Sequence, residues 1–180
     1  VMFCNKMSDK LGLERYYTIT WYGQIIDIIE SKKDYKIETN ENSKGFRLPT
    51  EWEWEYATKA GTQLEYSGSN DPNEVGWHSG NSKNKTKPVK GRKPNAWGFY
   101  DMSGNVWEWC WDWFDPGYYR VSPRADPTGP ATGDRRVQRG GSHLCHASYC
   151  NRYRTDARNG TEPDSAAPPT GFRCARDVVA

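Results

Sequence analysis

The seven residues Trp107–Trp113 alternate strictly between indole side chains and the side chains of Glu, Cys and Asp. A period of two is typical of a β-strand, in which successive side chains point to opposite faces. The segment therefore predicts a strand with four indoles on one face and Glu108, Cys110 and Asp112 on the other. Because an indole buries a large area, we expect this strand to anchor a loop-rich domain.

Aromatic residues compensate for a low aliphatic content. Only 24 of the 180 residues are Leu, Ile, Val or Phe, whereas the chain contains 9 Trp and 11 Tyr. The 25 basic and 23 acidic residues nearly cancel, which is unlike the high net charge of disordered proteins. The same balance disfavours a nucleic-acid surface, and no apolar run approaches the roughly 18 residues of a membrane span. We therefore expect a folded protein that binds neither nucleic acid nor membrane.

The N-terminal part of the chain predicts one helix and one hairpin. Apolar residues at three- and four-residue steps indicate a helix over residues 1–11, ended by Gly12. Residues 16–22 and 24–29 form β-branched and aromatic runs on either side of a glycine, which predicts a hairpin. Residues 30–44 are almost wholly polar and predict a surface loop.

The clearest helix start is a capping box, in which Thr50 is followed by Glu53. Gly61 is expected to end this helix. We predict a long irregular connection at residues 67–92 and two further strands at residues 136–139 and 172–176. Few helices, short strands and many loops indicate the α+β class, and one domain is sufficient for this length.

The sharpest candidate site is the segment Arg139–Cys150, which contains two cysteines, two histidines and two serines behind a diglycine. Thiolates are soft ligands, and two of them can satisfy the low coordination number of Cu(I). Cys145 and Cys150 are therefore candidates for a Cu(I) site or a redox dithiol. The residues alone leave three alternatives open: a local disulfide, part of a zinc site with His146, or two small buried side chains.

Two acidic segments are further candidates. In Asp101–Glu108, a carboxylate at each end and a Gly-Asn turn between them would let oxygen atoms converge on a hard cation such as Ca²⁺. The alternative is a hairpin whose acids are solvated. In Glu51–Tyr56, the acids lie at a helix start and the aromatic residues follow helical spacing. We interpret that segment as capping and core packing.

Four motifs, in their order and spacing, resemble the sulfatase-modifying factor domain family. They are the segments Gly45–Ala57, Asn95–Trp109, Arg139–Ser142 and Gly171–Arg173. The resemblance covers essentially all of residues 1–180 and implies an irregular, C-type-lectin-like α+β fold with few short helices and small antiparallel sheets. The family's domain normally starts further upstream, so we expect its N-terminal portion to be missing here.

The segment Ser142–Arg154 is similar to the active-site stretch of those family members that generate formylglycine. The resemblance implies a copper-dependent oxidase that uses O₂ to convert the cysteine of a sulfatase Cys-x-Pro-x-Arg motif to Cα-formylglycine. It makes Cys145 and Cys150 the Cu(I) ligands, and it places Ser142 and Trp107 at the reacting centre. His146 and Arg154 are expected to contact the substrate.

The resemblance also implies a structural calcium site. Asp101 and Glu108, together with the carbonyl groups of Gly104 and Val106, match the family's better-defined Ca²⁺ ligands. The carboxylates in this match are the same two that the residue pattern alone offers to a hard cation. Calcium is therefore expected as a structural cofactor beside copper.

The remaining expectations concern a candidate disulfide, the binding partner and the cellular compartment. Cys4 and Cys174 match a pair that is disulfide-bonded in relatives from oxidising compartments. The implied partner is an unfolded or nascent sulfatase polypeptide, and the chain is expected to be a soluble monomer, either cytoplasmic or exported.

Two rival functions use the same scaffold. In the first, the chain is a non-catalytic ligand-binding protein in which the loop at residues 142–170 recognises a ligand and the cysteines are idle or bridged. The second is an oxidase with an iron centre held by histidines. It is disfavoured because the chain has only 3 His and no His-x-x-x-His arrangement.

Overall fold

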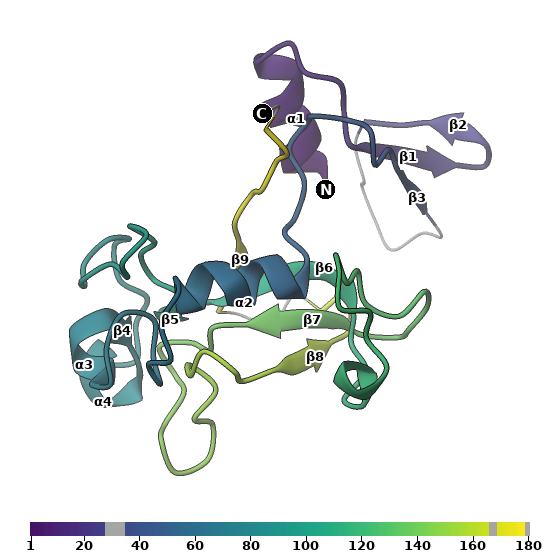
Figure 1. The fold of residues 1–180 in the computed structure, drawn as a ribbon. Helices are drawn as coiled ribbons and strands as arrows, with labels where there is room; N and C mark the ends of the chain where they lie inside the picture. Colours follow the sequence, from purple (N-terminus) through teal and green to yellow (C-terminus); the bar gives the residue numbers. More distant parts are fainter. Residues whose placement is uncertain (28–34, 166–168, 179–180) are drawn as a thin grey trace. The chain divides into compact units, whose positions relative to one another are not determined.

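The computed structural model describes residues 1–27, 35–165 and 169–178. The chain divides into two compact units (Figure 1). Unit 1 consists of Val1–Pro49 and Arg173–Ala180, and unit 2 consists of Thr50–Phe172.

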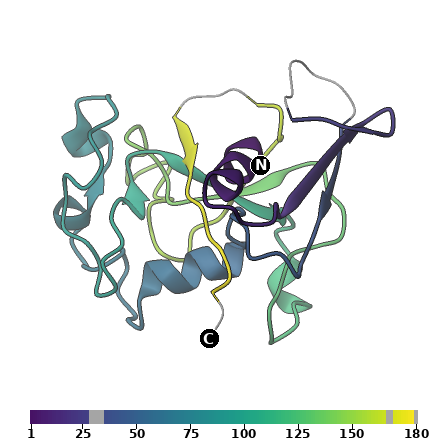
Figure 2. The ribbon, with the colours of Figure 1, turned by 90° about the horizontal axis from the view of Figure 1, so that it is seen from above.

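Unit 1 contains one long helix and a three-stranded antiparallel sheet (Figure 2). The helix α1 (Met2–Lys10) confirms the prediction for residues 1–11. The sheet has the order β2–β1–β3, with β1 at Tyr17–Trp21, β2 at Gln24–Ile25 and β3 at Lys36–Thr39. The Asn5 side chain donates a hydrogen bond of 2.9 Å to the carbonyl oxygen of Tyr17, which ties α1 to β1.

The predicted hairpin is confirmed, but part of the predicted polar loop is wrong. β1 and β2 are joined by a turn in which Tyr22 and Gly23 have φ values of 47° and 75°. The end of the predicted second strand, residues 28–29, lies outside the described residues. Residues 36–39 were predicted as loop but form β3, because Ile37 pairs opposite Ile19 while the polar neighbours stay on the accessible face of an edge strand.

Unit 2 is built on a four-stranded sheet with the order β8–β7–β6–β9. Its strands are β6 (Trp107–Trp113), β7 (Arg136–Arg139), β8 (Asn159–Thr161) and β9 (Thr170–Phe172). β6 pairs antiparallel with β7 and parallel with β9. The predicted strands at residues 107–113 and 136–139 are therefore confirmed. The strand predicted at residues 172–176 is displaced toward the N-terminus, and within unit 1 Ala175 forms an isolated bridge with Arg47.

The helix α2 (Glu51–Lys59) begins at the predicted capping box. The Thr50 hydroxyl accepts from the Glu53 amide at 3.2 Å, and the Glu53 carboxylate accepts from the Thr50 amide at 2.8 Å. The helix ends at Ala60 and Gly61, which both have positive φ. α2 packs against β6 and β7 around a core of Trp54, Met102, Cys110 and Val137.

The connection predicted as irregular contains short regular elements. They are α3 (Pro72–Val75), β4 (Gly76–Trp77) and α4 (Ser79–Ser82), and β4 pairs in parallel with β5 (Ser103–Gly104). A 3₁₀ turn, η1, follows β6 at Tyr118–Arg120. Short helices and small sheets joined by loops confirm the predicted α+β class. Within the described ranges, no helix has both the length and the apolar character that crossing a membrane requires.

The alternation along β6 is confirmed, but its more buried face is the acidic one. Glu108, Cys110 and Asp112 are 5%, 1% and 4% exposed, whereas the four indoles on the opposite face are half-buried. Burial of this face is possible because α2 supplies hydrogen-bond donors to both carboxylates. The Trp54 indole N–H donates to Glu108 at 2.7 Å, and the Glu51 amide donates to Asp112 at 2.7 Å.

Candidate functional site

The cysteine-containing segment leaves β7 through two glycines with positive φ, Gly140 (87°) and Gly141 (66°). A Cβ on Gly141 would lie 2.8 Å from the amide nitrogen of Tyr153 and 3.1 Å from the carbonyl oxygen of Arg152. Only glycine accommodates both this backbone conformation and this close approach. The diglycine therefore lets the beginning of the segment pass directly against its end.

Two backbone hydrogen bonds fix the position of Cys145. Its amide donates to the carbonyl oxygen of Ser142 at 3.0 Å, and its own carbonyl accepts from the Ser79 amide of α4 at 3.0 Å. The side chain is 3% exposed and packs with Tyr66, Val75 and Tyr153. A thiol in these apolar surroundings is shielded from water.

Cys150 lies beside Cys145. The Cys150 amide donates to the carbonyl oxygen of His146 at 2.9 Å, and this turn returns the chain to the same cluster. The Cα atoms of the two cysteines are 5.0 Å apart, and the structure records them in the oxidised, disulfide-bonded form. The local disulfide was one of the alternatives that the sequence left open. Reduction of this bond would give two adjacent thiols, one of them buried.

Ser142 and Trp107 are the other residues expected at the reacting centre, and both lie at the cysteines. Ser142 is 2% exposed, and its hydroxyl oxygen lies 3.8 Å from the Cys145 sulfur. The same hydroxyl accepts from the Leu144 amide at 3.2 Å. Trp107, the first residue of β6, packs against the cluster that contains Cys145. Residues from β6 and from the segment after β7 therefore meet at one place.

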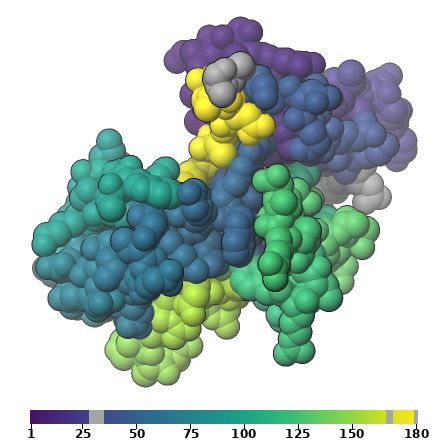
Figure 3. All heavy atoms as spheres, viewed as in Figure 1, coloured from purple at the N-terminus to yellow at the C-terminus, as the bar shows by residue number. Residues whose placement is uncertain are grey.

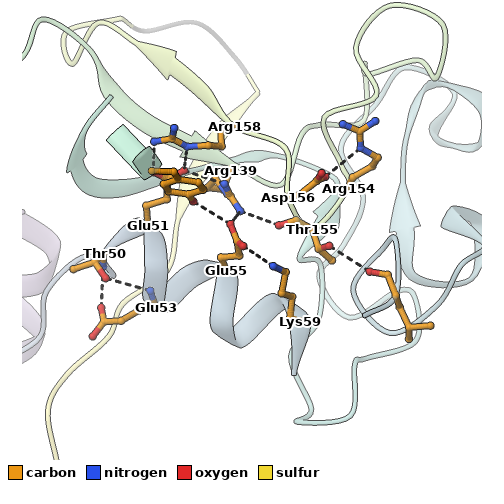
Figure 4. A network of polar contacts seen from close by, with 12 residues as sticks. Thr50, Glu51, Glu53, Glu55, Lys59, Arg139, Arg154, Thr155, Asp156 and Arg158 are labelled. Carbon is orange, nitrogen blue, oxygen red and sulfur yellow. Dashed lines mark hydrogen bonds and ion pairs between the residues drawn. The ribbon is translucent and has the colours of Figure 1, made fainter. Parts of the chain in front are cut away.

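The two expected substrate contacts, His146 and Arg154, are both on the surface. His146 accepts the Ser148 amide through Nδ1 at 3.1 Å, and its ring stacks on Tyr149 with centroids 5.6 Å apart. Arg154 is 39% exposed and forms an ion pair of 3.2 Å with Asp156 (Figure 4). A substrate carboxylate would therefore compete with Asp156 for Arg154.

His78 belongs to this neighbourhood, although nothing in the sequence marks it. Its ring stacks on Tyr153, with centroids 5.2 Å apart, and Tyr153 stacks on Tyr66 at 5.6 Å. The Gly80 amide donates to His78 Nδ1 at 3.3 Å. Burial lowers the pKa of His78, and Arg92 lowers it further. These contacts favour a neutral imidazole beside the cysteine cluster.

A buried ion network connects α2 to both ends of the cysteine-containing segment (Figure 4). Arg139 is fully buried and donates to Glu51 at 2.9 Å, to Glu55 at 2.5 Å and to the carbonyl oxygen of Thr155 at 2.8 Å. Arg158 binds Glu51 through two hydrogen bonds of 2.6 Å. Arg139 is the first residue of the segment Arg139–Cys150, and Thr155 and Arg158 follow that segment, so the network fixes the chain on both sides of the two cysteines.

The charges of this network stabilise one another. Burial works against the charge of Arg139, but Glu51 and Glu55 outweigh it and raise the pKa of the guanidinium. Burial likewise opposes ionisation of Glu55, and Arg139 and Lys59 together lower its pKa. The interpretation of Glu51–Tyr56 as capping and core packing therefore holds for Glu53 and Trp54, but Glu51 and Glu55 act as buried ion-pair partners.

The residues expected to bind calcium lie around β5 and the start of β6. The Asp101 Oδ2 atom accepts from the Lys90 amide at 2.7 Å, whereas its Oδ1 atom is buried without a hydrogen-bond partner. Gly104 accepts from the Val106 amide at 3.0 Å. One oxygen of Glu108 accepts from the Trp54 indole. Among the residues with described placement, no cluster of three or more His, Cys, Asp or Glu is arranged to hold a metal.

Cys4 and Cys174, which match a pair that is disulfide-bonded in relatives from oxidising compartments, lie side by side within unit 1. Their two sulfurs are 3.7 Å apart, and the structure records both residues as thiols. The contact with Cys174, together with burial, raises the pKa of Cys4, whereas the contact with Cys4 lowers the pKa of Cys174 to about 7. The resemblance thus identified two neighbouring cysteines, and a disulfide between them in an oxidising compartment stays a prediction.

Comparison with known proteins supports the family resemblance. Residues 1–178 match the sulfatase-modifying factor enzyme 1-like domain. The formylglycine-generating enzyme of Streptomyces coelicolor is 48% identical over 149 residues, which cover 74% of this chain and 48% of that enzyme. The formylglycine-generating enzyme of Mus musculus is 41% identical over 148 residues, which cover 74% of this chain and 40% of that enzyme. The chain thus spans about half the length of the curated relatives it matches.

Solved structures share the fold. The Treponema denticola variable protein 1 superposes with a TM-score of 0.84 at 40% identity, covering 97% of this chain and 66% of that chain. The structure of CarF superposes with a TM-score of 0.74 at 26% identity. The irregular α+β architecture predicted from the motifs is therefore confirmed.

Proposed function

The chain belongs to the family of sulfatase-modifying factor enzyme 1-like domains, and from this we propose that it oxidises a cysteine in the Cys-x-Pro-x-Arg motif of a sulfatase polypeptide to Cα-formylglycine, using copper and O₂. The observation that carries this proposal is the meeting of Cys145, Cys150, Ser142 and Trp107 at one place. The relatives that carry the name formylglycine-generating enzyme support the coarser statement that the chain is a sulfatase-modifying enzyme.

The cysteine pair fits a monovalent copper ion. Reduced Cys145 and Cys150 would supply two soft sulfur ligands from adjacent positions, with Cα atoms 5.0 Å apart. When bound, copper would supply the one-electron and O₂ chemistry that side chains lack. Cys145 is 3% exposed among apolar rings, which would exclude water and favour the soft ligand set over hydrated cations.

The surrounding residues would orient the substrate. The Ser142 hydroxyl faces the Cys145 sulfur and can donate a proton to a neighbouring sulfur or oxygen atom. Trp107 would cover the apolar side of the substrate cysteine. His146 follows Cys145 directly, and both His146 and Arg154 are at the surface, where their polar groups would bind the peptide backbone or its acidic side chains.

We also propose the calcium site at Asp101, Gly104, Val106 and Glu108. The buried, unpartnered Oδ1 atom of Asp101 supports it, because a buried carboxylate oxygen without a donor is costly unless a cation compensates it. Calcium would be structural there. Chelation is expected to lower the Tm, and Asp101→Asn should remove that shift; an unchanged Tm on chelation would contradict the site.

A binding protein on the same scaffold is the second candidate. It is favoured by the recorded disulfide between Cys145 and Cys150, which in this function would be a permanent crosslink. A free thiol titration separates the two candidates. The oxidase requires that the reduced protein lose two reactive thiols when one equivalent of Cu(I) is added, whereas a permanent crosslink offers no thiols at these positions.

The decisive experiment is incubation with a Cys-x-Pro-x-Arg peptide, copper and O₂, followed by mass spectrometry for the aldehyde. Cys145→Ser should abolish both aldehyde formation and tight Cu(I) binding. Cys110→Ser is the matched control, because Cys110 is 1% exposed in a different cluster and should leave both unchanged. Unchanged Cu(I) affinity in Cys145→Ser would refute the metal assignment.

A further inference from the structure

The segment Lys83–Lys93 in unit 2 concentrates positive charge. Its eleven residues include six basic side chains and no acidic one: Lys83, Lys85, Lys87, Lys90, Arg92 and Lys93. Since the chain has 25 basic and 23 acidic residues, the rest of it carries 19 basic against 23 acidic residues. Lys87 and Arg92 are half-buried and the other four are exposed. Figure 3 shows the blue to teal part of the chain that contains this segment at the surface.

Ring contacts hold part of this basic segment in place. The Arg92 guanidinium lies 3.7 Å from the ring centroid of Trp77, and the Lys87 ammonium lies 5.7 Å from it. In the described part of the chain, Glu74 is the only carboxylate in an ion pair with the segment, at 3.1 Å from Lys93. The Asp101 carboxylate approaches it as well, but accepts from the Lys90 backbone amide. Most of the positive charge is therefore not neutralised by the protein.

The basic segment is joined to the candidate site. The Ser82 hydroxyl, just before it, donates to the carbonyl oxygen of His143 at 2.8 Å. The Asn105 side chain forms hydrogen bonds with both the amide and the carbonyl of Lys87, at 2.9 Å and 3.1 Å, and its own carbonyl accepts from the His143 amide. His143 is two residues before Cys145, so the basic segment borders the cysteine-containing segment directly.

One open pocket is shared by the two segments. Asn84, Lys85 and Thr86 line it from the basic side, and His143, from the cysteine-containing segment, and Trp109, from β6, line it as well. Its volume is about 890 Å³, which is large enough for several amino-acid side chains. A polypeptide that passes through this pocket beside His143 would therefore lie against Lys85.

We propose that the basic segment Lys83–Lys93 binds an acidic stretch of the polypeptide substrate next to the Cys-x-Pro-x-Arg motif. The inference rests on the proposed function and adds a preference for substrates with acidic flanks. Exposed charges of one sign beside a binding site raise the encounter rate and select partners of the opposite sign. A short acidic peptide is favoured over a nucleic acid or a membrane, because an extended polyanion would also face the net negative remainder of the chain.

Peptide binding tests this proposal without copper or oxidation. Fluorescein-labelled peptides would contain a Ser-x-Pro-x-Arg core, so that no thiol reacts, extended at either end by four Asp or four Asn. We expect the Asp-extended peptide to bind about tenfold more tightly at low salt and to lose this advantage at high salt. Equal affinity of the Asp and Asn peptides in fluorescence anisotropy would overturn the proposal.

Charge reversal assigns the effect to the segment. The double variant Lys83→Glu/Lys85→Glu should lose most of the preference for the Asp peptide. The matched control, Lys6→Glu/Lys44→Glu, changes the net charge equally at exposed positions of unit 1 and should keep it. Equal losses in both variants would mean that the overall charge, not this segment, attracts the peptide.

Two further outcomes are informative. Binding of a labelled oligo-dT and of a vesicle with anionic lipid should also be measured. If either binds more tightly than the Asp peptide and loses that affinity in Lys83→Glu/Lys85→Glu, the proposed partner class is wrong. If the Asp peptide is preferred but no aldehyde forms from the corresponding cysteine peptide with copper and O₂, the proposed oxidase fails while the acidic-peptide site stands. If aldehyde forms with the same KM from the Asp-extended and the Asn-extended cysteine peptides, the oxidase stands and only the preference for acidic flanks is refuted.

Discussion

The two faces of β6 place polar and aromatic side chains in opposite environments. On one face, Glu108, Cys110 and Asp112 are buried beneath α2, and protein groups donate hydrogen bonds to both carboxylates. On the other face, the indoles are half-buried, and Trp107 contacts the cluster of Cys145 while Trp109 lines an open pocket. The acidic face therefore contributes to stability, whereas the indole face borders the groups available for chemistry.

The cysteines follow the same division. Burial raises the pKa of Cys110 well above its ordinary value, so this thiol stays protonated and unreactive in the core. Cys145 and Cys150 belong to the other cluster, where the structure records them bonded to each other. Substitutions of buried polar groups at α2, β6 and β7, each compared with an exposed control, show which interactions stabilise the folded state.

The largest effect is expected from Arg139→Met. This change removes one of the two cations of each buried carboxylate, leaving Arg158 with Glu51 and Lys59 with Glu55, and the loss of one partner from a buried ion pair costs about 3–5 kcal/mol. The free energy of unfolding from urea titration measures it. A loss below about 1 kcal/mol would contradict the assignment of the network as a stabilising element.

Arg154→Ala is the control for this prediction. Its ion pair with Asp156 is exposed by 39% and 67% on the two side chains, and exposed pairs contribute at most about 1 kcal/mol. A double variant, Arg139→Met with Glu55→Gln, should recover part of the lost stability, because it removes the carboxylate that Arg139 leaves and keeps the Glu51–Arg158 pair. Equal losses in the single and double variants would show that packing of Arg139, not its charge, dominates.

The local parts of this architecture were predictable from the sequence. The capping box at Thr50 and Glu53, the alternation of β6 and the turn around Gly23 each depend on residues within a few positions of one another. The cysteine segment was also recognisable, because Cys145 and Cys150 are separated by a single turn. Such features depend on the local backbone conformation, which a short sequence pattern is sufficient to predict.

The family resemblance supplied a few long-range neighbours, such as Trp107 and Cys145, but the residue pattern did not predict the buried ion network. Glu51 meets Arg139 across 88 positions, and the Trp54 indole meets Glu108 across 54. No pattern in the sequence says which carboxylate faces which donor, so the burial of the acidic face of β6 was missed. His78 was likewise missed, because its ring reaches the cysteine cluster by stacking on Tyr153, which lies 75 positions away in the sequence.

A smaller effect is expected from Trp54→Phe, which removes the indole N–H that donates to Glu108. A hydrogen bond to a buried charge contributes about 1.5–3 kcal/mol, so the free energy of unfolding should fall by that amount. Trp52→Phe in the same helix is the control, since Trp52 is 48% exposed. Equal losses for the two variants in urea titration would mean that the Glu108 carboxylate does not depend on the indole.

The smallest effect concerns the third member of the acidic face. Burial raises the pKa of Asp112 to about 7, although the Glu51 amide partly opposes this by donating to the carboxylate. An ordinary Asp has a pKa near 3.9, so the folded state binds a proton that the unfolded state releases, and stability falls as the pH rises from about 4 to about 7. His78, whose pKa is lowered, changes stability in the opposite direction, so only a comparison with Asp112→Asn isolates the carboxyl group.

Between pH 6 and pH 7, the wild-type protein should lose about 1 kcal/mol of unfolding free energy relative to Asp112→Asn. The asparagine can still accept from the Glu51 amide, so the variant keeps the local geometry while losing the titration. Asp156→Asn, on a side chain that is 67% exposed, should leave the pH profile parallel to wild type. If Asp112→Asn is parallel as well, Asp112 is already ionised at pH 6, which would contradict the raised pKa.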